Sequence, residues 1–309
     1  MPTVRTVLGD LDAAELGRTY CHEHLLTRPG PRIRADDDDL VLDDPARSIA
    51  ELQSFKSVGG GAVVEVTTPE FGRDAFGLAR LSEQSGVHIV ACAGHVSEEY
   101  WRGVLPIDRR DESDLVREFV RDLTQSIEGG PVRAGVIKVG TSRDEATAVE
   151  RLVMRAAAQA QIETGAPITT HTTAGTAALQ QVRVLEDAGA DLTHVCIGHL
   201  DRRLVWEDHL ALARSGVFLG YDCISKEQYE SDERRAEFIV RLVDAGFGNR
   251  ILLSGDLARR SYLEAWGGWP GYRHIIGAFL PRLQLAGLRS EHLDDLLVAN
   301  PARFLAWAT

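Results

Sequence analysis

The chain has 309 residues, of which 44% are hydrophobic and 26% are charged, a composition typical of a globular protein with a large buried core. Its length suits two average domains or one (β/α)8 barrel, which needs about 250 residues. The formal net charge of −12 argues against nucleic-acid binding, and no apolar run approaches the roughly 20 residues of a membrane span.

The first 44 residues predict little regular structure apart from one strand. The N-terminus lacks the apolar core of a signal peptide, so we expect a cytoplasmic protein. Residues 2–18 predict a hairpin or loop that covers one end of the fold, and residues 19–24 predict the first strand. Residues 27–44 are polar and include consecutive aspartates at 36–39. Because the spacing of a calcium loop is missing, we interpret this stretch as a solvated loop.

From residue 45 the chain alternates between helical and strand-like segments. The β-rich apolar runs predict strands at 62–68, 87–93, 134–139, 168–171, 193–199, 217–221 and 251–254. The segments between and after them, many followed by glycine, predict helices at 46–58, 73–85, 112–127, 144–164, 176–188, 204–214, 231–245, 272–286 and 290–299. We expect Ser290 to be the N-cap of the last helix.

Eight short strands that alternate with helices predict βα units around a parallel sheet. Nearly continuous apolar strands indicate a sheet that is buried on both faces. We therefore expect a closed (β/α)8 TIM barrel, with a doubly wound open sheet as the alternative. No G-x-G-x-x-G follows a strand, which gives a dinucleotide-binding fold little support. No linker divides the chain, so residues 1–309 are predicted to form a single domain.

The four cysteines lie far apart, and no two form a C-x-x-C pair. Each falls in a predicted strand, which favours buried, reduced thiols. Cys21 could be considered as a zinc ligand. However, strand alternation turns it away from its neighbour His22, so we exclude it.

The first strand ends in two histidines that share one face. Successive side chains of a strand point to opposite sides, so His22 and His24 project together. Two imidazoles placed in this way can supply half of a metal site. The motif is weak by itself, because two surface histidines would look the same.

Further ligand-type residues stand near the ends of other predicted strands. In a (β/α)8 barrel the active site forms at the carboxyl ends of the strands, where the chain places Lys138, His171, His199 and Asp256. Any one of them could be an ordinary hydrogen-bonded residue. Their common position at strand ends instead predicts a shared metal site.

The chain resembles the phosphotriesterase family of the amidohydrolase superfamily over nearly its whole length. The resemblance is carried by Cys-His-Glu-His-Leu at 21–25, Gly-Tyr-Asp at 220–222, Asp-Glu-Arg-Arg at 232–235, Ile-Leu-Leu-Ser-Gly-Asp at 251–256 and Asn-Pro-Ala-Arg-Phe at 300–304. It implies a (β/α)8 barrel with two divalent metal ions, usually zinc, with manganese, cobalt or iron as alternatives. It also implies a small-molecule substrate and a homodimer.

The resemblance also implies how the ligands are shared. One metal ion would take His22, His24 and Asp256, and the other would take His171 and His199. Lys138, carboxylated to N6-carboxylysine, would bridge the two ions.

Physical chemistry supports this role for Lys138. An ammonium group has no acceptor for a metal, and burial beside two dications disfavours the ammonium form. The neutral amine can add carbon dioxide and become an anionic bridge. The alternative is a buried lysine that is paired with Asp256 or Glu65.

Such a centre predicts hydrolysis at a carbonyl or phosphoryl group. Two metal ions lower the pKa of a shared water and polarise a substrate oxygen. Asp256 is then the candidate general base, and Lys138 the second catalytic residue. No G-x-S-x-G elbow is present, so covalent serine chemistry is not required.

The substrate is left open among phosphotriesters, N-acyl-homoserine or other apolar lactones, and sugar lactones that carry a phosphate. Lys226 and Arg259 follow the last two strands, where barrels often bind phosphate, and Tyr262 adds a donor. These positions resemble the phosphate-holding residues of the branch that hydrolyses phosphorylated furanose lactones. The preferred prediction is therefore a hydrolase of lactones or carboxylic esters with an anionic group. Alternatively, these charges pair with Glu227 or Glu264 at the rim.

Two further residues are candidates for substrate contact. His95 and Tyr100 lie in the loop after the third strand, which is predicted to lean over the site, although either could serve in packing. A non-catalytic binding protein on a degenerate barrel remains the last alternative. It would be expected to lack one or more ligands, and none of the six is missing.

Overall fold

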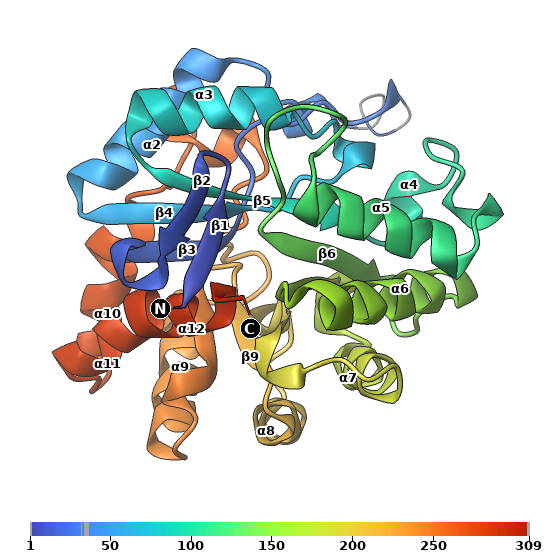
Figure 1. Ribbon diagram of the computed structural model, residues 1–309. Coiled ribbons are helices and arrows are strands. Elements are labelled where there is room, and N and C mark those ends of the chain that lie inside the picture. Colours follow the sequence, from blue (N-terminus) through green and yellow to red (C-terminus); the bar gives the residue numbers. More distant parts are fainter. Residues whose placement is uncertain (1, 32, 34–36, 308–309) are drawn as a thin grey trace.

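The computed structural model describes residues 2–31, 33 and 37–307. Its main sheet is a nearly closed barrel of eight parallel strands surrounded by helices (Figure 1). The strands are β3 (Arg18–Glu23), β4 (Gly60–Glu65), β5 (His88–Gly94), β6 (Val136–Thr141), β7 (Ile168–Thr172), β8 (Val195–Ile197), β9 (Phe218–Tyr221) and β10 (Ile251–Leu253). Each strand pairs with the next one along the chain, which confirms the predicted (β/α)8 barrel and excludes the doubly wound sheet.

Helices follow the strands around the outside of the barrel. They are α2 (Pro45–Ser57), α3 (Ala75–Ser85), α5 (Glu112–Thr124), α6 (Ala148–Thr164), α7 (Ala178–Asp187), α8 (Trp206–Ser215) and α9 (Asp232–Asp244), with the short α4 (Glu98–Trp101) after β5. Helix α6 begins later than predicted because Thr147 and Glu150 form a capping box that sets the first turn. It ends at Gly165, which has the left-handed conformation that glycine adopts without strain.

The C-terminal helices differ most from the prediction. The segment expected at 272–286 is a π-helix at Ile275–Phe279 that continues into α10 (Leu280–Leu285). The segment expected at 290–299 is α11 (Ser290–Asp294), a π-helix at Asp295–Ala299 and then α12 (Asn300–Leu305). The prediction that Ser290 is the N-cap is wrong. The helix includes Ser290 as its first residue, so Arg289 occupies the N-cap position without a side-chain cap bond.

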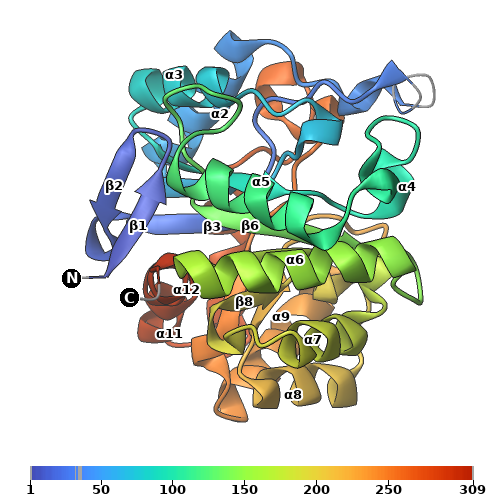
Figure 2. The same cartoon turned by 45° about the vertical axis from the view of Figure 1, so that its right-hand side comes forward.

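A hairpin and the last helix cover one end of the barrel. Strands β1 (Thr3–Thr6) and β2 (Gly9–Asp12) pair antiparallel, as expected for residues 2–18. The Trp307 N–H donates to the Thr3 carbonyl at 3.0 Å, so the two ends of the chain lie side by side (Figure 2). Figure 2 shows helix α4 at the opposite end, where the carboxyl ends of the strands open.

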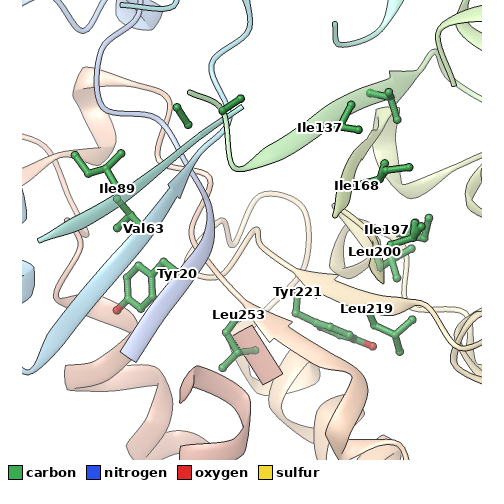
Figure 3. Packing of buried hydrophobic residues seen from close by; sticks show 14 of the residues in the cluster. Tyr20, Val63, Ile89, Ile137, Ile168, Ile197, Leu200, Leu219, Tyr221 and Leu253 are labelled. Atoms are coloured by element: carbon green, nitrogen blue, oxygen red, sulfur yellow. The ribbon is translucent and has the colours of Figure 1, made fainter. Parts of the chain in front are cut away.

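Strand side chains alternate between two buried clusters. One set, which includes Val63, Ile89 and Ile137, packs against the helices (Figure 3). The other, which includes Val64 and Val90, forms a smaller cluster inside the barrel together with Phe304 of α12. Both faces of the sheet are therefore buried, which explains the nearly continuous apolar strands.

A bulge in β3 changes the expected direction of Cys21. Tyr20 lies opposite Val63, but Glu23 lies opposite Glu65, so β3 holds one residue more than β4 over this stretch. Cys21 packs in the interior cluster with Cys196, and the bulge breaks the strict alternation that was expected to turn Cys21 away from His22.

The other cysteines agree with the prediction of buried thiols, with one difference in position. All four are free and buried, but Cys223 lies two residues beyond β9 instead of within a strand. Burial raises the pKa of Cys21 well above its usual value. Its thiol is therefore held in the neutral form, which is a poor metal ligand.

The barrel closes between its first and last strands mainly through the side chains of Glu23 and Ser254. The Glu23 carboxylate accepts hydrogen bonds from the Ser254 hydroxyl at 2.8 Å, the Gly255 N–H at 2.7 Å and the Leu257 N–H at 2.9 Å. Ser254 Oγ also accepts from the His22 N–H at 3.0 Å. We call this set of contacts the seam. In it, a buried carboxylate and hydroxyl take the place of a regular ladder.

Among the helices that the structure describes, none combines the length and apolar character needed to cross a membrane.

The contacts of the seam predict that loss of the Ser254 hydroxyl destabilises the fold. Ser254→Ala should lower the free energy of unfolding by about 1–3 kcal/mol, because buried groups on both strands lose a partner. Urea unfolding after metal chelation measures this without a contribution from bound ions. Ser57→Ala is the matched control, since Ser57 is exposed and bonds only within its own helix. Equal stability of the two variants would contradict a closing role for Ser254.

Candidate metal centre

The six predicted ligands all line one cavity at the carboxyl ends of the strands. The cavity has a volume of about 150 Å³, and its lining includes His22, His24, Lys138, His171, His199 and Asp256. Three of them lie within β3, β6 and β7, and His24 directly follows β3. His199 and Asp256 lie beyond the ends of β8 and β10. Both of these have positive φ angles, of 57° and 47°, so the backbone turns sharply at each.

The ligand atoms of these residues face one another. His24 Nε2 lies 3.3 Å from Asp256 Oδ1, and His22 Nε2 lies 3.7 Å from the same oxygen. His199 Nε2 lies 2.8 Å from His171 Nδ1. Lys138 Nζ lies 3.2 Å from His22 Nε2. The arrangement gathers nitrogen and oxygen atoms around a common centre.

Burial favours the neutral form of three of these nitrogen groups. It lowers the pKa of His22 to about 3, that of His171 well below its usual value and that of Lys138 to about 8. A neutral imidazole is the form that binds a metal ion. Four imidazoles, one lysine amine and one carboxylate that converge in one cavity fit a site for two divalent ions.

Asp222 orients two of the histidines and was missed as a site residue. Its Oδ2 lies 3.0 Å from His22 Nδ1 and its Oδ1 lies 2.7 Å from His199 Nδ1. Both rings therefore present Nε2 to the cavity. A carboxylate behind a ligating histidine is a common support for metal binding. The Gly-Tyr-Asp stretch at 220–222 could have identified Asp222 as a site residue, since this aspartate directly follows an apolar strand.

Lys226 is held by Asp256. Its Nζ lies 2.5 Å from Asp256 Oδ2 and 2.6 Å from the Asp256 carbonyl oxygen, so its partner is not Glu227. Burial opposes ionisation of Asp256, but the Lys226 ammonium and the nearby histidines outweigh it and hold the pKa of Asp256 well below its usual value. Asp256 is therefore a carboxylate at neutral pH.

Arg259 is engaged by the acidic run, which does not behave as a solvated loop. Arg259 forms an ion pair with Asp37 and lies 3.8 Å from Asp39. Asp39 also accepts hydrogen bonds from the N–H and hydroxyl of Ser261. The run is thus tied to the loop after β10, and Glu264 is not the partner of Arg259. Asp36 lies outside the described residues.

The two predicted substrate contacts after β5 have different positions. Tyr100 lines the cavity, and its ring is perpendicular to that of His171 at 6.0 Å. His95 does not line it. Its side chain is buried, with Nδ1 3.2 Å from Glu70 and Nε2 3.3 Å from Glu118. The prediction that His95 contacts the substrate is therefore wrong, because the two carboxylates hold its side chain away from the cavity.

Arg202 and Tyr229 also line the cavity and were not predicted. The Arg202 guanidinium stacks on the Tyr229 ring, with its Cζ 4.0 Å from the ring centroid. Arg202 stands three residues after His199, and its proximity to that ligand was the available signal. Tyr262, which was predicted, lines the cavity as well and accepts a hydrogen bond from Gln228 at 3.1 Å.

Comparison with known sequences places the chain among hydrolases. The sequence model of the phosphotriesterase family matches residues 2–305. A phosphotriesterase homology protein of Escherichia coli is 33% identical over 290 residues, covering 93% of this chain and 97% of that protein. The N-acetyltaurine hydrolase of Bos taurus is 31% identical over 351 residues, covering 98% of each chain.

Solved structures agree with this result. A lactonase from Listeria monocytogenes superposes with a TM-score of 0.95 at 33% identity, covering 99% of this chain and 100% of that chain. The Escherichia coli phosphotriesterase homology protein, solved with phosphate in its active site, superposes with a TM-score of 0.90 at 33% identity. That alignment covers 94% of this chain and 99% of that chain.

The position of Asp222 predicts a supporting role in metal binding. Asp222→Asn should weaken metal affinity by roughly 10- to 100-fold, because the two rings lose their charged partner. Competition with a chromophoric chelator gives the affinity. Asp208→Asn is the control, since Asp208 pairs with Arg203 on the surface. An unchanged affinity in Asp222→Asn would show that the histidines are oriented without it.

The burial of His95 predicts a pH-dependent stability. Burial alone would lower the pKa of His95, but Glu118 and Glu70 raise it to about 9. His95 therefore stabilises the fold fully below its unfolded pKa of about 6.5, and this contribution is lost as the pH rises to 9. Burial would likewise raise the pKa of Glu118, but His95 and Arg110 lower it to about 2. Its contribution is thus present above pH 4.5 and is lost in acid.

Unfolding free energies at pH 6 and pH 9 test this. The wild type should lose about 2–3 kcal/mol more than His95→Gln between these pH values. His194→Gln is the control, since His194 is paired with Asp191 near the surface. Parallel pH profiles for the wild type and His95→Gln would refute the charged state of His95.

Proposed function

The chain belongs to the phosphotriesterase family, and from that premise we propose that it hydrolyses lactones or carboxylic esters, with a preference for sugar lactones that carry a phosphate or another anionic group. The relatives are hydrolases, and the chain is one as well. The observation that carries the proposal is a single cavity that combines six ligand-type residues with the cations Lys226 and Arg259.

The proposed cofactor is a pair of divalent ions, with zinc as the first choice. His22, His24 and Asp256 would hold one ion, and His171 and His199 the other, with Lys138 as N6-carboxylysine between them. Once bound, the ions would supply Lewis acidity, which lowers the pKa of water and polarises the substrate carbonyl.

The protein side chains would orient the reaction and move the proton. Lys226 occupies Oδ2 of Asp256, so Oδ1 stays directed at the histidines. In this proposal Asp256 Oδ1 accepts the proton of the attacking water, as a positioned general base does. Tyr100 and the loop after β5 would limit access of bulk water from one side.

The size and charge of the cavity support a compact anionic substrate. A volume of about 150 Å³ is below the usual 300–1,000 Å³ of pockets for drug-sized ligands, so it suits a small lactone better than a long acyl chain. Cations favour an anionic group through charge-assisted hydrogen bonds. The relative from Listeria monocytogenes is described as a lactonase, and the one from Escherichia coli was solved with phosphate in its active site.

A second candidate is hydrolysis of an acylated amino sulfonate. Several relatives are named N-acetyltaurine hydrolases, and that of Bos taurus is 31% identical. N-acetyltaurine is a small amide with a sulfonate at its far end. It therefore shares with a phosphorylated lactone both an attackable carbonyl and a remote anion.

A substrate panel with the metal-loaded protein tests the proposal. We expect kcat/KM for a phosphorylated γ-lactone to exceed that for the neutral γ-lactone by roughly tenfold or more, and only weak hydrolysis of an aryl phosphotriester. Chelation should abolish every activity. The highest kcat/KM for N-acetyltaurine would favour the second candidate, and that for the triester would favour a phosphotriesterase. Full activity after chelation would exclude the metal centre.

A further inference from the structure

The cations that line the cavity differ in whether they already have an anionic partner. Lys226 is bound by Asp256 at 2.5 Å, and Arg259 is paired with Asp37. Lys138 is buried at the metal centre, against His22. Within residues 2–31, 33 and 37–307, no carboxylate forms an ion pair with Arg202. Its Nε is buried without a hydrogen-bond partner in that same part of the chain.

The position of Arg202 is set by the residue before it. The Asp201 side chain is fully buried and pairs with Arg235 at 2.8 Å, and it accepts a hydrogen bond from the Cys223 N–H at 3.0 Å. Arg235 is held in turn by Asp232 at 3.0 Å. These contacts of Asp201 fix the short turn Leu200–Arg202. The Arg202 side chain lines the cavity.

The stack on Tyr229 suits Arg202 to anion binding. The Arg202 Cζ lies 4.0 Å from the ring centroid, so one face of the guanidinium is covered. Its N–H groups point outward in the plane of the guanidinium, where they can bind two oxygens of a carboxylate, sulfonate or phosphate. Stacking also reduces the side-chain freedom that would be lost when the ligand binds.

We infer that Arg202 is the main recognition residue for the anionic group of the substrate. An anion at Arg259 must compete with Asp37, and an anion at Lys226 must compete with Asp256. An anion at Arg202 displaces no ion-pair partner among the described residues. This inference rests on the proposed function for the reaction at the metal centre, and it adds the group that selects the substrate.

The experiment compares the metal-loaded wild type with Arg202→Gln on two substrates, a neutral γ-lactone and the same lactone with a terminal phosphate. The ratio of kcat/KM, charged over neutral, should fall by roughly 10- to 100-fold in Arg202→Gln, because charge-assisted hydrogen bonds are lost. Arg203→Gln is the matched control. Arg203 is exposed, pairs with Asp208 and does not line this cavity, so the ratio should remain that of the wild type.

A binding measurement separates this inference from the proposed function. Tetrahydrofurfuryl phosphate and tetrahydrofurfuryl alcohol form a charged and neutral pair that contains no carbonyl to hydrolyse. Calorimetry with the metal-loaded proteins should show roughly 10- to 100-fold weaker binding of the phosphate to Arg202→Gln than to the wild type. The metal content of each variant confirms that its site is intact.

The outcomes differ for the two claims. If no lactone is hydrolysed but the phosphate binds in a manner that depends on Arg202, the lactonase proposal fails and the inference stands. If lactones are hydrolysed but Arg202→Gln changes neither the kcat/KM ratio nor phosphate binding, the inference is overturned. An equal loss in Arg203→Gln would also overturn it, because the effect would then come from general surface charge.

Discussion

The seam between the first and last strands is the constraint on which the rest of the structure depends. Glu23 of β3 accepts three hydrogen bonds from residues 254–257 beyond β10, and the Asp256 N–H donates to the His22 carbonyl at 3.1 Å. These residues are neighbours or members of the metal-binding set. Closure of the barrel therefore sets the distances of His22 and His24 from Asp256. The same short segments contain both the seam contacts and these ligand-type residues.

Around this seam, most buried charges are neutralised by a specific partner. Asp222 faces two imidazoles, Asp256 faces Lys226, and Asp201 faces Arg235. Pairing is required because an isolated buried charge costs several kcal/mol. This pairing limits which charged side chains can bind a ligand. Charges that hold the site together are not free for a ligand, and in the described part of the chain Arg202 is the cavity arginine without an ion pair.

Local sequence rules worked where the structure is decided locally and failed where strands and loops adjust to one another. Gly165 ends α6 as the sequence predicted, whereas the predicted start at residue 144 lies four residues before the start that the Thr147 capping box sets. The bulge in β3 could not be recognised from local sequence rules, so strict alternation does not hold between Tyr20 and Glu23. A bulge arises from the pairing of two strands, which the periodicity of one strand does not encode.

The sequence by itself determined the barrel and the convergence of the six ligand-type residues, because parallel strands in a βα series bring their carboxyl ends to one side. The tertiary structure alone decided how the charges pair. Arg259 meets Asp37 from the other end of the chain, and His95 is taken by Glu70 and Glu118. The physical reason is that an ion pair depends on the path of whole loops in space, whereas sequence patterns report only the faces of single helices and strands.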